Sequence, residues 1–294
     1  MLRERGVILR GTVFSPGEPS LPRTRSRRGS RSPLTRDAIA AALGPAGRSL
    51  ALEVVDSVDS TNSELLRRAE KNDIHGQVIV AERQMAGRGR RGRGWISVAG
   101  GSLAFSLGWR FAKPASALTA LPLAVGLALA EALESEDFVG VALKWPNDLV
   151  HRGRKLAGVL VELSGAARAA SVAVIGIGIN VRLPSTVRRA IDRPVTDLAS
   201  IAPGRSIDRN ALLGRLLAGQ ARMLERYASS GFAPMHEAWQ RRHALHGQAV
   251  RIHRPEGGTV NGTVAGVDAD GALRLSSGGR SSRFLSGEVS LRRR

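Results

Sequence analysis

Four arginines and four glycines are interleaved between Gly87 and Gly94, and Trp95 follows them. A hydrophobic core cannot bury so many guanidinium groups. A bent glycine backbone, in contrast, lets several of them bind one phosphate through paired hydrogen bonds. Trp95 would then cover an aromatic ring, unless it is a core residue. The alternative for the whole stretch is a flexible Arg-Gly segment that binds RNA without sequence preference. Its place between two predicted strands favours an ordered ligand loop.

The pentapeptide KWPND, residues 144–148, ends a predicted strand, and Pro146 forces a turn there. In such a turn Lys144 would neutralise phosphate, Asn147 would hydrogen-bond a nucleotide, and Asp148 would hold Mg²⁺ through oxygen. The alternative is an ordinary turn in which Asp148 caps backbone groups.

Lys155 stands at the start of another predicted strand, and Gly158 allows a ligand to approach the backbone closely. We expect this strand to be accessible at a sheet edge. Gly176 and Gly178 look at first like a dinucleotide-binding fingerprint, but residues 180–184 cannot open the helix that such a site requires. Small residues along a buried strand, with Asn180 at its end, fit better.

The stretch DSTNSE, residues 59–64, lies between a predicted strand and a predicted helix. Thr61 and Glu64 have the spacing of a capping box, which would start the helix. Free backbone N–H groups at a helix start can hold an anion or a polar ligand.

These segments need a scaffold of mixed strands and helices to position them. Apolar alternation predicts strands at Leu50–Val55, Gln77–Glu82, Ser102–Trp109, Val141–Lys144, Leu156–Leu163 and Ser171–Ile179. Helical periodicity and capping predict helices at Thr35–Leu43, Thr61–Glu70, Ala117–Glu134, Asp208–Ala228 and Ala233–Arg242.

After His246 the chain changes to short β-prone runs, which predict a small barrel. The hairpin signals that separate these runs are Gly257-Gly258, Asn261-Gly262, Asp270-Gly271 and Gly278-Gly279. We therefore expect a domain boundary near residue 246.

The composition describes a globular chain of 294 residues, with 43% hydrophobic residues and no cysteine. The missing cysteines exclude thiol nucleophiles, thiolate metal sites and disulfides. The most apolar stretch, Leu118–Leu133, contains Pro122 and Glu131, so we expect a buried helix and no membrane span. The first residues lack the apolar centre of a signal peptide, and we expect a cytoplasmic protein.

The formal charge of +19 predicts attraction to polyanions, but it is unevenly distributed. Residues 1–36 carry nine Arg and two Glu, and therefore +7 of this charge. This proline- and arginine-rich stretch has no apolar periodicity, and we expect residues 1–34 to be a disordered tail. The preference for Arg over Lys can reflect the base composition of the gene as much as a ligand.

Taken together and in this order, the segments resemble the biotin–protein ligases: DSTN at 59–62, GRGRRGR leading to Trp95, KWPND, KLAG at 155–158 with Glu162, and GIGIN at 176–180. The resemblance covers roughly residues 50–182. It implies an α+β fold with a central mixed β-sheet flanked by helices, of the class II synthetase-like, biotin/lipoate ligase type, and a small C-terminal SH3-like β-barrel. The implied domains are a tail at 1–34, a catalytic biotin- and ATP-binding domain at 35–246, and the β domain at 247–294.

The resemblance also implies the reaction. Biotin carboxylate attacks the α-phosphate of Mg-ATP to give biotinyl-5'-AMP and pyrophosphate, and a carrier lysine then attacks the anhydride. By this analogy the catalytic residues are Lys155, Arg90 and Asp148, and Asp148 would engage Mg²⁺. The biotin contacts would be Ser60, Thr61, Asn62, Gln84, Gly87, Arg88, Gly89, Arg90, Lys155 and Gly158. The ATP contacts would be Arg90, Arg93, Trp95, Lys144, Asn147, Lys155 and Asn180.

The implied partner is the biotin carboxyl carrier domain of a carboxylase. Residues 1–49 offer only one helix and the tail, so the resemblance is to a monofunctional ligase, without sequence-specific DNA binding. A homodimer is left open. Two other functions stay open at this point: a lipoate or other acyl-adenylating ligase, and a non-specific RNA- or DNA-binding protein.

Overall fold

The structure is a computed structural model that describes residues 32–165, 170–253, 257–285 and 290–293. The predicted disordered tail at 1–34 lies outside these residues, except for its last three.

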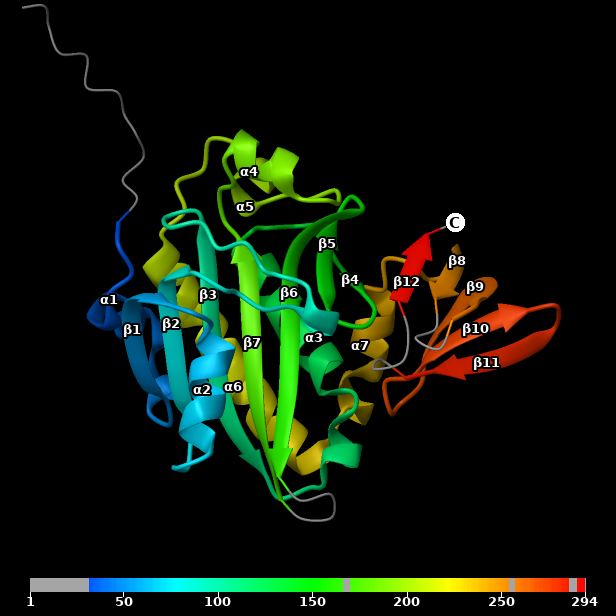
Figure 1. Ribbon diagram of the computed structural model, residues 1–294, viewed down its shortest axis with the longest axis horizontal. Coiled ribbons are helices and arrows are strands. Elements are labelled where there is room, and N and C mark those ends of the chain that lie inside the picture. The colour runs from blue at the N-terminus through cyan, green and yellow to red at the C-terminus, as the bar shows by residue number, and fades with distance from the viewer. Residues whose placement is uncertain (1–31, 166–169, 254–256, 286–289, 294) are drawn as a thin grey trace, which may run out of the picture. The chain divides into compact units, whose positions relative to one another are not determined.

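A seven-stranded mixed sheet forms the larger part of the described chain (Figure 1). Its order is β1-β2-β3-β7-β6-β5-β4, and only β1 and β2 are parallel. The strands are β1 (Ala51–Val58), β2 (Gln77–Gln84), β3 (Ser102–Phe111), β4 (Val141–Lys144), β5 (Asp148–His151), β6 (Arg154–Gly165) and β7 (Ser171–Asn180). The expected central mixed sheet is confirmed.

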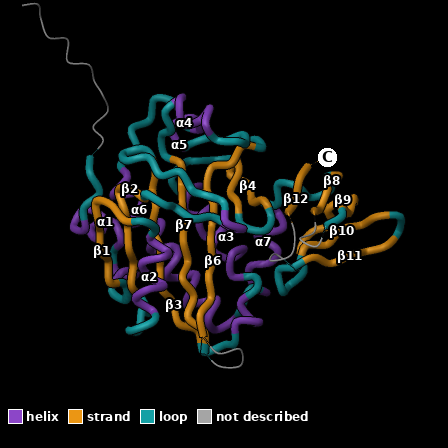
Figure 2. Tube along the Cα trace, in the orientation of Figure 1, coloured by secondary structure: helices purple, strands orange, loops and turns teal. Residues whose placement is uncertain are grey.

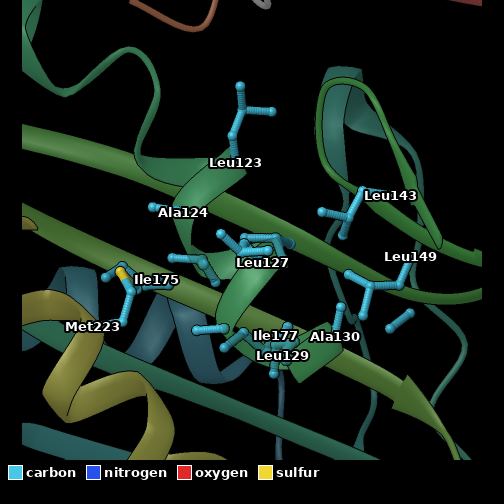
Figure 3. Close-up of a cluster of buried hydrophobic side chains, with 14 of the residues drawn as sticks. Leu123, Ala124, Leu127, Leu129, Ala130, Leu143, Leu149, Ile175, Ile177 and Met223 are labelled. Atoms are coloured by element: carbon cyan, nitrogen blue, oxygen red, sulfur yellow. The ribbon is translucent and has the colours of Figure 1, made fainter. Parts of the chain in front are cut away.

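Helices cover both faces of this sheet. Neighbouring residues of a strand point to opposite faces, so they pack against different helices. On one face Val174 of β7 packs with Leu65 of α2 (Thr61–Ala69). On the other face Ile175 and Ile177 belong to the core under α3 (Leu121–Glu134) and α6 (Arg209–Ser230). Figure 3 shows this second cluster, in which leucines of α3 meet β4, β5 and β7. The first helix, α1 (Arg36–Leu43), packs against α6.

The apolar stretch Ala115–Glu134 is long and apolar enough to cross a membrane by length and composition, and 67% of its most apolar 18 residues are buried inside the protein. It contains a 3₁₀ turn, Ala115–Leu118, and α3, joined by residues 119–120. The stretch packs against the sheet and α6, so its apolar composition is that of a core helix, as the sequence predicts.

The C-terminal strands form a separate five-stranded antiparallel sheet. They are β8 (Ala249–His253), β9 (Thr259–Val267), β10 (Leu273–Ser277), β11 (Arg280–Phe284) and β12 (Ser290–Arg293), in the order β11-β10-β9-β8-β12. This agrees with a small SH3-like β domain.

One predicted hairpin turn in this sheet is wrong. Asn261 and Gly262 lie inside β9 and pair with β8. A Cβ atom on Gly262 would lie 2.8 Å from the Ser276 carbonyl oxygen of β10, so the glycine is needed for close packing of strands. Asp270-Gly271 and Gly278-Gly279 do lie between strands, as predicted.

Lys155 does not lie at an accessible edge, because β6 is paired on both sides, with β5 and β7. The short strand β5, which begins with Asp148 and ends with His151, was not predicted. A tight turn joins β5 to β6, with Arg152 at φ 49° and Gly153 at φ 75°. Two short helices were also missed, α4 (Ser185–Ala190) and α5 (Leu198–Ile201). The predicted helix at 233–242 is a 3₁₀ turn followed by α7 (His236–Arg241).

Candidate functional site

One pocket on the α2 side of the large sheet gathers most of the residues that the sequence singles out. The loop between β2 and β3 runs across the strands (Figure 2). Residues of this loop form one wall of the pocket. The predicted residues that line the pocket are Ser60, Thr61, Asn62, Gln84, Arg88, Gly89, Arg90, Arg93, Trp95, Asn147, Lys155, Gly158 and Asn180. Gly87, Lys144 and Asp148 do not line it.

The Arg-Gly stretch forms a small hairpin, because its two arms hydrogen-bond to each other. Gly89 N donates to Arg93 O at 2.7 Å, and Trp95 N donates to Gly87 O at 2.8 Å. The chain reverses at Arg91 and Gly92, with φ 59° and 68°, which is the left-handed region that glycine tolerates without strain. The hairpin presents Arg88, Arg90 and Arg93 to one pocket. The stretch is therefore an ordered loop, as expected, and its role in binding a ligand stays a prediction.

The start of α2 forms the second wall, but its cap differs from the prediction. Ser60, not Thr61, is the N-cap, and its hydroxyl accepts from Ser63 N at 3.4 Å. Thr61 instead donates through its backbone N and its hydroxyl to Gln84 Oε1, at 2.8 and 3.0 Å. The side-chain oxygen of Gln84 is thus occupied by two hydrogen bonds from Thr61. The side-chain nitrogen of Gln84 is the group that it can offer to a ligand.

Gly176 and Gly178 of β7 make room for side chains of the pocket. A Cβ atom at Gly176 would lie 2.2 Å from Asn62 Oδ1, and one at Gly178 would lie 2.3 Å from the Trp95 ring. These two glycines are on the α2 face, one residue out of step with Ile175 and Ile177 in the core. The rejection of a dinucleotide fingerprint in favour of a strand with small residues is thus consistent with the fold.

Lys155 lies at the centre of a short chain of contacts. Its ammonium group is 2.6 Å from Asp148 Oδ1 and 5.7 Å from the centre of the Trp95 ring. A Cβ atom at Gly158 would lie 2.8 Å from Lys155 Nζ, so this glycine leaves the lysine side chain its place. Asp148 is therefore a partner of Lys155, behind the pocket surface.

Arg90 is largely buried in the loop. Burial is the main cause that lowers the pKa of Arg90 from its ordinary value, and the charge of Asp148 opposes this. Its guanidinium donates to Asn147 Oδ1 at 3.3 Å, while Asn147 Nδ2 donates to Val159 O at 2.6 Å. A buried cation favours an incoming anion, because such charges interact more strongly away from water.

Asn180 supports the pocket through the backbone. Its amide nitrogen donates to Thr196 O at 3.0 Å and to Lys155 O at 3.5 Å. Lys155 N donates in turn to Pro194 O at 2.9 Å. Asn180 thus joins the strand that carries Lys155 to the segment before α5.

That segment is part of the site that the sequence analysis missed. Residues 190–193 and Val195 line the pocket. Asp197 anchors the segment, because its buried carboxylate accepts from Leu183 N at 2.6 Å and Ser200 N at 2.8 Å and pairs with Arg188. The N-cap pattern Asp197–Ser200 was the sequence signal that could have revealed it.

One buried polar group points to a ligand. The indole nitrogen of Trp95 is buried without a hydrogen-bond partner in the described part of the chain. Leaving a buried donor unpaired costs roughly 1–3 kcal/mol, so a ligand acceptor beside Trp95 would recover this energy.

Within residues 32–165, 170–253, 257–285 and 290–293, no group of three or more His, Asp or Glu side chains could hold a metal ion. Asp148 supplies one carboxylate.

Comparison with family models places most of the pocket residues inside one family description, while residues 190–193 and Val195 lie beyond it. The model described as the biotin/lipoate A/B protein ligase family matches residues 54–180, and the model of the biotin protein ligase C terminal domain matches residues 245–292.

Individual proteins of known name are similar over most of the chain. The bifunctional ligase/repressor BirA of Escherichia coli K12 is 36% identical over 239 residues, which are 81% of this chain and 73% of BirA. The biotin--[acetyl-CoA-carboxylase] ligase of Mycobacterium tuberculosis is 38% identical over 81% of this chain and 88% of its own length. A solved structure of Aquifex aeolicus biotin protein ligase in complex with biotin and ATP has 32% identity and a TM-score of 0.70, and covers 83% of this chain and 99% of that chain.

Proposed function

The chain belongs to the biotin/lipoate A/B protein ligase family, and we infer that it is a biotin–protein ligase, which activates biotin with ATP and transfers it to a carboxylase carrier. The observation that carries this inference is the pocket itself. Three arginines of one hairpin and Lys155 line it together, beside the unpaired indole nitrogen of Trp95.

In this reaction the protein positions the substrates and supplies fixed charges, and it needs no nucleophile of its own. A carboxylate oxygen of biotin bonds to the α-phosphorus of ATP, and pyrophosphate leaves. The ε-amine of a carrier lysine then attacks the acyl carbon of the mixed anhydride, and AMP leaves. Both steps build negative charge on oxygen, which fixed cations in a pocket away from water stabilise.

We assign the joining point of the two substrates to Lys155 and Arg90. Both side chains line the pocket, and Asp148 acts on both, by an ion pair with Lys155 and by its charge on Arg90. The ammonium and the guanidinium would hold the carboxylate and the α-phosphate side by side, and reduce the repulsion between them.

The biotin end of the proposed site is the α2 side. Polar groups at the helix start and on β2 supply donors and acceptors for a small polar head, with Gln84 offering its amide nitrogen. The proposed contacts are Ser60, Thr61, Asn62, Gln84, Arg88, Gly89 and Gly158, while Gly87, which does not line the pocket, shapes the loop itself.

The nucleotide end is the side of Trp95. The proposed contacts are Arg93, Trp95 and Asn147, with Asn180 acting through the backbone of Lys155. Lys144 does not line the pocket, and its proposed contact would be with phosphates that extend beyond it.

Mg²⁺ belongs to this proposal as the ion that accompanies ATP. It commonly binds through one or two carboxylates and substrate phosphates and keeps several waters. The proposed carboxylate is that of Asp148, which lies beside the pocket with its Oδ1 paired to Lys155. When bound, the ion would neutralise phosphate charge.

The remaining parts of the proposal concern context. We propose that residues 35–246 are the catalytic domain, that residues 247–294 are a supporting β domain, and that the protein acts in the cytoplasm without sequence-specific DNA binding. The acceptor would be a biotin carboxyl carrier domain, in line with the acetyl-CoA-carboxylase in the name of the Mycobacterium tuberculosis relative. A homodimer is compatible with all of this.

The test is transfer to a carrier. Purified protein, biotin, ATP and Mg²⁺ are incubated with a biotin carboxyl carrier domain, and the domain is analysed by mass spectrometry. We expect one added biotin, on one lysine, and none on a domain whose acceptor lysine is replaced by arginine. A carrier that stays unmodified while the enzyme is folded would contradict the function. Attachment of lipoate to the carrier in place of biotin would reassign the substrate.

The nucleic-acid alternative is disfavoured by the loop. The Arg-Gly stretch is a hydrogen-bonded hairpin whose arginines line a pocket, whereas non-specific binding uses open basic segments with stacking aromatic residues.

A further inference from the structure

We propose that Glu162 is a positioning residue for the biotin end of the pocket, because it fixes Arg88 and Asn62, which line the pocket, without lining it itself. This inference rests on the proposed function. It assigns a role to a residue of β6 that faces α2 and the loop between β2 and β3.

The first contact of Glu162 closes the loop over the sheet. Arg88 forms two hydrogen bonds with its carboxylate, NH2 to Oε1 at 2.7 Å and NH1 to Oε2 at 3.1 Å. This two-bond geometry is the one that orients a guanidinium most strongly. The side chains are 43% and 24% exposed, so without the pair Arg88 would be free to turn into solvent.

The second contact fixes an amide. Asn62 Nδ2 donates to Glu162 Oε2 at 2.9 Å, and Asn62 is buried. A carboxylate only accepts, so the amide nitrogen of Asn62 must face Glu162 and its oxygen must face the other way. That oxygen accepts from Ser106 Oγ at 2.6 Å.

The contacts then continue from Ser106 to the pocket. Ser106 Oγ lies 2.6 Å from Asn62 Oδ1 and 2.7 Å from Thr61 Oγ1, so it joins Asn62 to the first residue of α2. Thr61 also donates its backbone N–H to Gln84 Oε1, which leaves the Gln84 amide nitrogen for the ligand. Glu162 therefore holds one end of a hydrogen-bonded network that reaches the pocket through Asn62, Ser106 and Thr61.

The contacts of Glu162 lie at the proposed biotin end of the pocket and not at the nucleotide end. Both arms of Glu162 reach the α2 side of the pocket, whereas the contacts of Lys155, Trp95 and Asn147 do not involve it. Loss of the Glu162 charge should therefore weaken biotin binding and leave ATP binding and the chemical step nearly unchanged.

The experiment is a double-mutant cycle on biotin binding, measured by calorimetry without ATP, in Glu162→Gln, Arg88→Gln and the double variant. Glutamine keeps an acceptor for Asn62 but loses the charge that Arg88 needs. A charge-assisted contact of this kind corresponds to about a tenfold change, so we expect each single variant to bind biotin about tenfold more weakly. Because the residues act as one unit, the double variant should bind about as weakly as either single variant.

The control is Glu134→Gln, which removes a comparable ion pair with Arg242, 2.7 Å long, from a site outside the pocket. It should leave biotin affinity unchanged. In steady-state turnover, Glu162→Gln should raise the KM for biotin and leave the KM for ATP and kcat within about twofold, a split that a general loss of structure would not give.

Two outcomes would overturn the proposal: biotin affinity of Glu162→Gln within twofold of the wild type, or effects of the two substitutions that multiply in the double variant. The result is separable from the proposed function. Wild-type protein that binds biotin but forms no adenylate would contradict the ligase activity alone, and the binding cycle would still decide the role of Glu162. Wild-type protein that does not bind biotin would contradict both.

Discussion

At the scale of single residues, the site is built from side chains whose charge is held in place by another side chain. Lys155 has Asp148, and Arg90 has Asn147. The residue types and their order predicted which side chains meet, but not these pairings. Asp148 shows why. The hairpin of β5 and β6 brings Asp148 next to Lys155, and β5 was too short and too polar to be predicted.

Replacement of Lys155 by alanine should strongly slow adenylate formation while the protein stays folded. The ammonium group would supply a charge-assisted contact of about 1.5–3 kcal/mol at the reacting oxygens, so the rate should fall by about 10- to 150-fold. Biotin-dependent pyrophosphate release measures this. The exposed Lys71 provides the matched control, and Lys71→Ala should be unaffected. A near-normal rate for Lys155→Ala would remove Lys155 from the reaction.

Replacement of Arg90 by glycine should let the intermediate escape. The buried guanidinium would hold the phosphate of the adenylate, and its loss should speed adenylate dissociation by about 10- to 150-fold, with a smaller effect on biotin affinity. Rapid filtration of labelled adenylate measures the rate. Arg91→Gly is the control, because Arg91 is exposed at the hairpin tip and does not line the pocket. If both variants release adenylate at the wild-type rate, Arg90 has no such role.

At the scale of elements, apolar alternation was enough to predict the strands that form the middle of the sheet, because their residues must be buried on one or both faces. The same reasoning failed for α4 and α5, which have few buried residues and are held by the ionic and backbone contacts of Asp197. The extension of β6 to Arg154 was also missed, since a hairpin partner, not hydrophobicity, keeps Arg154 and Lys155 in the strand.

A methyl group at Gly178 tests how β7 shapes the site. In Gly178→Ala the Cβ would lie 2.3 Å from the Trp95 ring, so Trp95 must move. Overpacking of this kind costs about 1–3 kcal/mol, and we expect the KM for ATP to rise by about tenfold. Gly219→Ala on α6 is the control, because its nearest side-chain contact would be an ordinary 3.7 Å. An unchanged KM in Gly178→Ala would mean that Trp95 does not contact the nucleotide.

At the scale of the whole molecule, the described chain contains two sheets that meet at a residue of the KWPND segment. Trp145 is buried, and its indole nitrogen donates to Gly271 O at 3.0 Å, in the turn between β9 and β10. The same turn accepts from the Thr119 hydroxyl at 2.8 Å. Composition and glycine pairs predicted the second sheet, but no local pattern reveals a contact between residues 126 positions apart.

His243 makes the stability of the fold dependent on pH. Both of its ring nitrogens are buried without partners among the described residues, and burial, helped by the charge of His246, lowers the pKa of His243 to about 4. In the unfolded chain it would titrate near 6.5, so between about pH 6.5 and 4 the unfolded state binds a proton that the folded state does not. Stability should therefore fall as the pH falls through this window.

Urea unfolding at pH 7 and pH 4.5 measures the effect. We expect His243 to account for a loss of about 2 kcal/mol between these two values, which His243→Phe should abolish. The exposed His253 provides the control, and His253→Gln should behave as the wild type. Equal pH dependence in the wild type and His243→Phe would contradict this origin of the loss.

The most direct test of the central claim, that the arginine hairpin and Lys155 form one site for joining biotin to AMP, is adenylate formation without a carrier. Enzyme in molar excess is mixed with biotin, Mg²⁺ and ATP labelled at the α-phosphate, and the protein-bound label is identified. We predict biotinyl-5'-AMP that stays with the protein and requires biotin. Label that remains in ATP, or that appears as AMP whether or not biotin is present, would contradict the account.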